Sequence, residues 1–135
     1  MRLTSFTDYG LRMLMRMASA PDRAFSTADL AQEFNLSRNH LSKIMQRLSQ
    51  AGIVQTKRGG GGGAVMAIAP SELRLGAIVR LLEENQPLVE CLAKGTNSCT
   101  LDGRCSLKTR LRAAEISFLK ELDKTSLADI ALAKD

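Results

Sequence analysis

The chain has 135 residues, of which 44% are hydrophobic and 24% charged, proportions typical of one globular domain rather than of a disordered chain. Aromatic residues make up only 4%, with no Trp, which argues against a surface for stacking single-stranded bases. No apolar run reaches about 18 residues, and the N-terminus has no apolar signal region. The sequence therefore predicts no membrane segment and a cytoplasmic protein.

Positive charge is concentrated in the first half of the chain. Residues 1–70 hold nine Lys or Arg and four Asp or Glu, whereas residues 71–135 hold ten of each. The segment 37–58 has five basic residues and no acidic one. Such a segment indicates a polyanionic partner, and double-stranded DNA is the first candidate. A solvated basic face is the alternative.

The first half also has the pattern of a helix-turn-helix. Apolar spacing predicts a helix over 5–19, with Ser5 and Asp8 as its capping box. Ser26 and Ser37 are the expected N-caps of two further helices, over 27–34 and 38–51, which a short turn separates. Gly52 suits the left-handed residue that closes the second of these.

A glycine run lies between two apolar stretches that read as strands. The expected strands cover 53–57 and 64–69, and Gly59–Gly63 lie between them. A flexible linker is one interpretation of the glycines. Because the run is short and its flanks are apolar, a hairpin is favoured, and a hairpin after a helix-turn-helix predicts a winged helix. A phosphate-binding P-loop is excluded because no Lys-Ser/Thr pair and no helix follow.

The helix over 38–51 is the expected recognition helix. The DNA major groove admits one α-helix, whose N-terminal residues usually contact base edges. The candidate base-reading residues are Arg38, Asn39, His40, Ser42, Lys43 and Gln46. The candidate phosphate-binding residues are Arg47, Lys57 and Arg58. His40 is expected to be an exposed polar residue on this face rather than a metal ligand. A plain polar surface helix is the alternative interpretation.

The second half predicts a helix over 70–84, a glycine-containing loop and a long helix over 106–123. Ser126 and Asp129 then resemble the capping box of a short helix. The loop holds all three cysteines of the chain, Cys91, Cys99 and Cys105. An odd number without a signal peptide argues against a disulfide framework. Three thiolates can instead hold a soft metal or an iron–sulfur cluster, and a four-iron cluster needs a fourth ligand from elsewhere. Three ordinary cysteines are the alternative.

The long helix carries an apolar stripe along one face. Its members are Leu107, Leu111, Ala114, Phe118 and Leu122. The stripe is either ordinary core or a contact with a second copy of the chain, and the second reading is favoured because the winged helix already has its core. The expected fold is mainly α with a small β-hairpin, as a winged helix-turn-helix plus a long dimerisation helix. The expected units are a DNA-binding domain over 1–84, a cluster-binding loop over 85–105, and a dimerisation helix with a short C-terminal helix over 106–135.

Several strings resemble the Rrf family of bacterial winged-helix regulators, many of which carry iron–sulfur clusters. They are MRLTSFTDYGLR over 1–12, SRNHLSKI over 37–44, FLKELD over 118–123 and LAD over 127–129. The same strings are similar to those of the family's nitric-oxide-sensitive repressors. The resemblance covers nearly the whole chain.

The resemblance implies a homodimer with one iron–sulfur cluster per subunit, 4Fe–4S rather than 2Fe–2S. Cys91, Cys99 and Cys105 would supply three ligands, and Asp8 of the partner subunit the fourth. It further implies a transcriptional repressor of genes for nitric-oxide detoxification and nitrogen-oxide metabolism, with nitric oxide as the signal.

Two departures from the family pattern keep alternatives open. The first cysteine gap has seven residues where many of these repressors have five, and a longer gap resembles the family's iron-responsive regulators. Gly60, Gly61, Val65 and Met66 stand where members often carry polar or basic residues, which leaves the wing's DNA contact open. An iron–sulfur electron carrier and a constitutive DNA-binding protein with a structural metal are the other readings. The sequence contains no paired carboxylates and no nucleophile–base arrangement that would indicate an enzyme.

Overall fold

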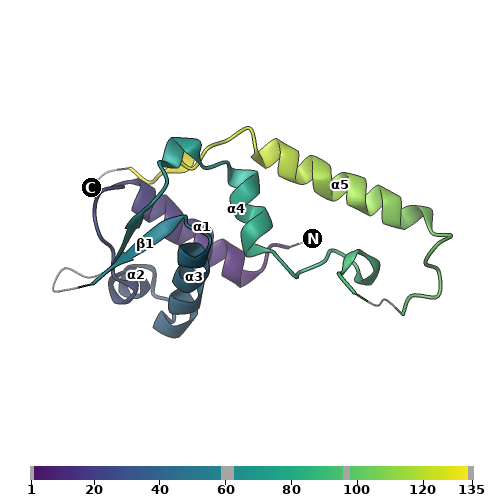
Figure 1. Cartoon of the computed structure of the whole chain (residues 1–135), viewed down its shortest axis with the longest axis horizontal. Coiled ribbons are helices and arrows are strands. Elements are labelled where there is room, and N and C mark those ends of the chain that lie inside the picture. Colours follow the sequence, from purple (N-terminus) through teal and green to yellow (C-terminus); the bar gives the residue numbers. More distant parts are fainter. Residues whose placement is uncertain (1, 59–62, 96–97, 134–135) are drawn as a thin grey trace.

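The computed structural model describes residues 2–58, 63–95 and 98–133 of the chain. Helices α1–α4 and a β-hairpin form one body, and α5 extends away from it (Figure 1). The α-helices are α1 (Ser5–Ala18), α2 (Thr27–Phe34), α3 (Arg38–Gln50), α4 (Leu75–Leu82) and α5 (Ser106–Leu122). The other elements are the strands β1 (Val54–Lys57) and β2 (Gly63–Met66) and the 3-10 helices η1 (Pro70–Glu72), η2 (Glu90–Leu92) and η3 (Ala128–Ile130).

The core lies around α1, against which α3 and α4 pack. The apolar residues of α1 recur at helical spacing, so that Met13, Leu14 and Met17 are all fully buried. Close packing depends on Gly10, where an added Cβ would lie 2.8 Å from Leu82 Cδ1 and 3.2 Å from Ile44 Cγ2. The other fully buried large apolar side chains are Leu30, Leu41, Ile44, Leu48, Val54, Ile78, Val79 and Leu127.

The predicted helix-turn-helix is confirmed. Ser26 is the N-cap of α2, and its hydroxyl accepts the N–H of Asp29 at 3.0 Å. Ser37 is the N-cap of α3, and its hydroxyl accepts the N–H of His40 at 3.3 Å. Between them Asn35 is left-handed, with φ 55° and ψ 51°, which ends α2 and starts the turn.

The predicted hairpin is also confirmed, with shorter strands than expected. β1 and β2 are antiparallel, with Val54 opposite Met66, and β2 ends there rather than at residue 69. Phe25, which precedes α2, adds a third extended segment, because its N–H and carbonyl pair with those of Ala64 at 2.8 and 2.9 Å. The tip of the wing, residues 59–62, lies outside the described residues.

The predicted capping box at the start of α1 is wrong. Thr4 is the N-cap, and its hydroxyl accepts the N–H of Thr7 at 3.3 Å. Ser5 is already helical, and Asp8 pairs with Arg12 one turn further on. The cap therefore lies one residue earlier than expected, and the Asp8 carboxylate takes no part in it.

The helix predicted over 70–84 is two elements, η1 and α4. Leu73 and Arg74 between them are extended, with ψ 116° and 136°. The break lets the carbonyl of Leu73 accept the N–H of Leu127 at 2.8 Å, and lets the N–H of Leu75 donate to the carbonyl of Thr125 at 2.9 Å. Because Leu73 and Leu127 are both buried, anchoring the C-terminal segment outweighs a continuous helix.

The C-terminal segment returns from α5 to the body. The predicted capping box there is confirmed, since Ser126 N–H donates to Asp129 at 2.8 Å and Asp129 N–H donates to the Ser126 hydroxyl at 3.2 Å. The backbone and side-chain hydrogen bonds from Ser126 hold the pKa of the Asp129 carboxyl below its ordinary value. By contrast, no residue of α5 is fully buried. Among the described residues, no helix is long and apolar enough to span a membrane.

α4 and α5 meet at Gly76, where an added Cβ would lie 2.4 Å from the carbonyl oxygen of Leu119. A change from Gly to Ala inside a helix normally stabilises by about 1 kcal/mol. We expect Gly76→Ala to do the opposite and to lower the free energy of unfolding by about 1–3 kcal/mol, because the backbone of α5 must move. Urea denaturation measures this change, and equal or greater stability would contradict the close contact.

Candidate DNA-binding surface and cluster loop

α3 turns a polar face away from the core. Leu41, Ile44, Met45 and Leu48 are buried, so that the residues between them face outward. The first turn of α3 holds no acidic residue. Five of the predicted base-reading residues are exposed, namely Arg38, Asn39, Ser42, Lys43 and Gln46. The face therefore offers cationic and hydrogen-bonding groups of the kinds that read base edges in a major groove.

His40 departs from the prediction of an exposed residue, because it is half-buried against α1. Its ring centroid lies 5.2 Å from that of Tyr9, with the planes at 72°, and 6.2 Å from that of Phe6. The Arg12 guanidinium lies 5.2 Å from the centroid of the Tyr9 ring. These contacts tie the first turn of α3 to the first half of α1.

The predicted phosphate-binding residues differ in their surroundings. Lys57 and Arg58 are exposed on the wing. Arg47 is half-buried and forms an ion pair with Glu84, just beyond the end of α4. If Arg47 contacts DNA phosphate as predicted, the phosphate must compete with the Glu84 carboxylate for it.

Such competition would make the two members of the pair act in opposite directions on DNA affinity. We expect Arg47→Ala to weaken specific and random DNA alike and to lower the salt slope by about one. Glu84→Gln should strengthen binding to both, because it releases the guanidinium. Fluorescence anisotropy at several salt concentrations measures both effects. Glu115→Gln on α5 is the charge-matched control. Equal effects of the two Glu variants would show that the Arg47–Glu84 ion pair does not cause the change in DNA affinity.

Asp8, the predicted fourth cluster ligand, is about half exposed, and its carboxylate accepts two hydrogen bonds of 3.0 Å from Arg12. The start of the same helix is fixed by Glu83. The Glu83 carboxylate accepts hydrogen bonds from the N–H and hydroxyl of Thr4 and from the hydroxyl of the fully buried Thr7. The helix turn that carries Asp8 is therefore anchored to the end of α4.

The cysteines lie in the segment that runs from η2 to the start of α5, and all three are half-buried. Cys91 is in η2, and Cys105 is the N-cap residue of α5. Within residues 2–58, 63–95 and 98–133, no three His, Cys, Asp or Glu side chains are close enough together to hold a metal ion. The single chain thus does not bring the three thiols and Asp8 to one point, and their assignment as ligands stays a prediction.

The residue before Cys91 contacts the residue before Cys99. The Glu90 carboxylate accepts the N–H of Ser98 at 2.9 Å and its hydroxyl at 2.6 Å. These two hydrogen bonds hold the pKa of the Glu90 carboxyl below its ordinary value, and the bond from the hydroxyl has the larger effect. The two ends of the segment between Cys91 and Cys99 therefore lie next to each other.

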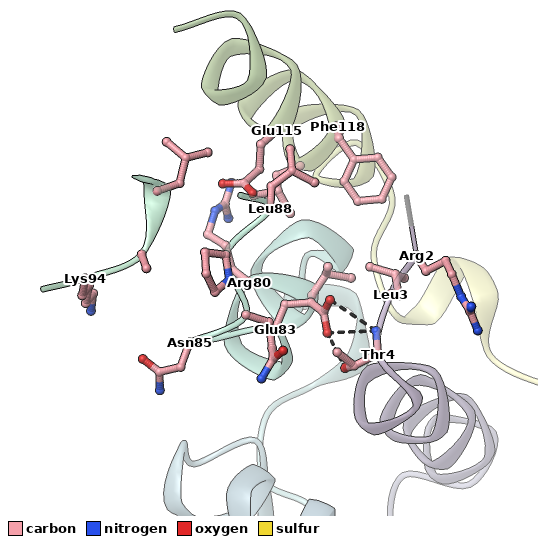
Figure 2. A pocket seen from close by; sticks show the side chains of 16 residues that line it. Arg2, Leu3, Thr4, Arg80, Glu83, Asn85, Leu88, Lys94, Glu115 and Phe118 are labelled. Atoms are coloured by element: carbon pink, nitrogen blue, oxygen red, sulfur yellow. Dashed lines mark hydrogen bonds between the residues drawn. The ribbon is translucent and has the colours of Figure 1, made fainter. Parts of the chain in front are cut away.

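A pocket of about 540 Å³ separates this segment from the body (Figure 2). Leu92, which follows Cys91, lines the pocket, and so do Leu3 and Thr4 at the start of α1. Phe118 of α5 closes it from above in the view of Figure 2. The segments that carry Cys91 and Asp8 therefore border the same pocket in one chain.

Sequence reasoning missed the residues that connect these sites. The contact of His40 with Phe6 and Tyr9, the pairing of Arg47 with Glu84, and the anchoring of α1 by Glu83 all join residues far apart in the sequence. A usable signal existed only for Glu90 and Ser98, a carboxylate and a hydroxyl that immediately precede two of the cysteines.

Comparison with known proteins supports the same picture. The sequence profile of the Rrf2 family, described as iron-dependent transcriptional regulator, matches residues 3–133. The chain is 40% identical over 136 residues to HTH-type transcriptional regulator NsrR of Halalkalibacterium halodurans, with 100% of this chain and 93% of the relative covered. It is 37% identical to NsrR of Bacillus subtilis with the same coverage.

The structure of CymR, the global cysteine regulator of B. subtilis, superposes with a TM-score of 0.75 at 27% identity over 100% of this chain and 99% of that one. These relatives are named as regulators, and regulation rather than catalysis is the function of the family. The chain belongs to the Rrf2 family of transcriptional regulators, with NsrR proteins among its relatives.

Proposed function

We propose that this DNA-binding regulator is a homodimeric repressor of the cytoplasm whose DNA affinity is controlled by an iron–sulfur cluster that responds to nitric oxide. The observation that carries the proposal is the combination of a polar, acid-free recognition helix with a loop that holds every cysteine of the chain. The similarity to NsrR over the whole chain supports it. The repressed genes would be those of nitric-oxide detoxification and nitrogen-oxide metabolism.

The donor set fits such a cluster by its chemistry. Three soft thiolates suit iron in a cluster, and the carboxylate of Asp8 suits a fourth, more open position. When bound, the cluster would supply iron that is open to small diatomic molecules. Three cysteines and one carboxylate would supply the four attachment points that the proposed 4Fe–4S cluster needs, one for each iron.

Exposed apolar side chains on α5 support the dimer. Leu107 is 60% exposed and Ile116 47% exposed, and the main contacts of α5 are with α4 and η2. A second copy that covers this helix would remove the exposed apolar surface from water. Two winged helices would then lie on two half-sites of a DNA operator.

The chain also offers a physical route between the two functions. Asp8 and Tyr9 are neighbours on α1, and Tyr9 contacts His40 in the first turn of the recognition helix. A change in what Asp8 binds would shift this part of α1, and the ring contact would pass the shift to α3. Small shifts of this kind change the spacing of two recognition helices in a dimer.

Anaerobic purification, followed by an absorption spectrum and DNA binding before and after nitric oxide, tests the proposal. We expect a visible absorption band that nitric oxide changes, and DNA affinity that falls with it. Affinity that stays the same after complete loss of the metal would favour a constitutive DNA-binding protein with a structural metal. Turnover with an electron donor in the absence of DNA binding would favour an electron carrier.

Arg38 at the start of α3 tests the DNA contact directly. If this exposed guanidinium makes a bidentate contact with guanine, Arg38→Ala should cost about 1–3 kcal/mol of specific binding and relax base preference at one position. Competition titrations with operator variants measure both effects. Equal binding of wild-type protein to specific and random DNA would refute recognition by α3.

An iron-responsive regulator is the second candidate. The seven-residue gap between Cys91 and Cys99 and the description of the matching family as iron-dependent favour it. DNA binding that is lost on mild iron chelation, yet is unchanged by nitric oxide, would support this function over the first.

A further inference from the structure

We propose that Glu90 and Ser98 form a clasp that holds Cys91 and Cys99 as an adjacent thiol pair across their seven-residue gap. The proposal rests on the proposed function, because it explains how this gap can serve one cluster. The two clasp residues are positioning residues, and neither is assigned as a ligand.

The geometry of the clasp is defined by three groups. One carboxylate oxygen of Glu90 accepts both the hydroxyl of Ser98 at 2.6 Å and its backbone N–H at 2.9 Å. Two donors from one residue on one oxygen fix the backbone as well as the side chain at that point. Hydrogen bonds to a charged acceptor are stronger than those between neutral groups.

The neighbours of the clasp then fix the two cysteines. Each cysteine is one peptide unit from a clasp residue, and consecutive Cα atoms are about 3.8 Å apart. Cys91 is held in η2, where the N–H of Ala93 donates to the Glu90 carbonyl at 3.1 Å. Cys99 begins a turn in which its carbonyl accepts the N–H of Asp102 at 3.3 Å.

The same turn is tied to the helix that starts at Cys105. Asp102 forms an ion pair with Lys108 of α5 at 3.0 Å. The clasp therefore links the Cys91 end of the loop to the Cys99 end, and the ion pair links the Cys99 end to the helix that follows Cys105. The gap between Cys91 and Cys99 has seven residues, two more than the five of many nitric-oxide-sensitive repressors of the family. The longer gap can still serve one cluster, because the chain is joined at Glu90 and Ser98 rather than at the cysteines themselves.

The first experiment measures thiol proximity in the metal-free protein. Reduced full-length protein carrying Cys105→Ser is equilibrated with oxidised and reduced glutathione, and the Cys91–Cys99 disulfide is quantified by peptide mass spectrometry. In this assay the two thiols give two protons and two electrons to oxidised glutathione, which becomes two reduced molecules. We expect Glu90→Ala to lower the equilibrium constant for the disulfide by roughly two- to tenfold.

The graded variants separate a clasp from a general structural role. Ser98→Ala should have a smaller effect than Glu90→Ala, because the backbone N–H of residue 98 still donates. Ser98→Thr should leave the disulfide equilibrium constant at the wild-type value, because it keeps the hydroxyl. Thr100→Ala removes a hydroxyl from the same segment outside the clasp and should change nothing. Equal disulfide constants in wild type, Glu90→Ala and Ser98→Ala would overturn the proposal.

The second experiment restores Cys105 and measures the visible spectrum and the iron and sulfide content after anaerobic reconstitution. The clasp predicts faster loss of cluster absorbance under mild chelation in Glu90→Ala than in Thr100→Ala. If the wild type takes up no cluster while Glu90→Ala still lowers the disulfide constant more than Ser98→Ala does, the proposed function fails and the thiol pair stands. If the cluster forms with equal stability in every variant and the disulfide constants are equal, the clasp fails and the proposed function stands.

Discussion

Replacing any one of Cys91, Cys99 and Cys105 by Ala should reduce bound iron and sulfide to less than about a tenth of the wild-type content. Each thiolate would hold one iron, and two thiols with one carboxylate are too few attachment points for a four-iron cluster. The fold should survive, because the cysteines are half-buried and lie outside the core around α1. Iron and sulfide analysis per monomer, beside circular dichroism, measures both.

The matched control is Thr100→Ala, which alters the same segment without removing a thiol. DNA binding of the three cysteine variants should resemble that of wild-type protein after metal removal, because they reach the same cluster-free state. Unchanged iron content in all three variants would refute the assignment of these residues as ligands. Loss of helical content together with iron would show that the segment serves the fold instead.

The local patterns of the winged helix were sufficient to predict its elements. Helix α2 and the caps at Ser26 and Ser37 were predicted correctly, because capping depends on residues only three positions apart. The buried face of α3 followed from its periodicity for the same reason. The start of α1 at Ser5 was predicted correctly, but its N-cap was placed one residue too late. Thr4 and Ser5 are both good caps, and a contact with the distant Glu83 selects Thr4.

The errors in the predicted fold came from contacts between segments that are distant in the sequence. Nothing local in 70–84 indicates the break at Leu73 and Arg74, which exists because the C-terminal segment pairs with this backbone. The half-burial of His40 has the same origin, since it depends on two rings of α1. The proposed cluster site is the extreme case, because within the described residues of one chain no three candidate ligands lie together, and the proposed fourth ligand would come from a second copy.

Asp8 is the residue on which the sensing proposal depends most. A carboxylate is a harder ligand than a thiolate and binds iron less strongly, so the position it occupies should be the most open to a small diatomic. In the single chain the Asp8 carboxylate is held by Arg12, and binding to the partner's cluster would exchange the guanidinium for iron. We therefore expect Asp8→Cys to keep the cluster, with an altered spectrum and a slower reaction with nitric oxide.

The alternative is that Asp8 only forms its surface ion pair with Arg12, a contribution of about 0.5 kcal/mol. Arg12→Gln distinguishes the two roles, because it removes the ion pair and leaves the carboxylate. A ligand role predicts that Arg12→Gln retains cluster and spectrum, whereas Asp8→Ala loses cluster stability. An ion-pair role predicts the same small loss of thermal stability in both variants and unchanged cluster chemistry. If Asp8→Ala leaves spectrum and nitric-oxide reactivity untouched, Asp8 is not the fourth ligand, and the long Cys91–Cys99 gap becomes the stronger indication of an iron-responsive regulator.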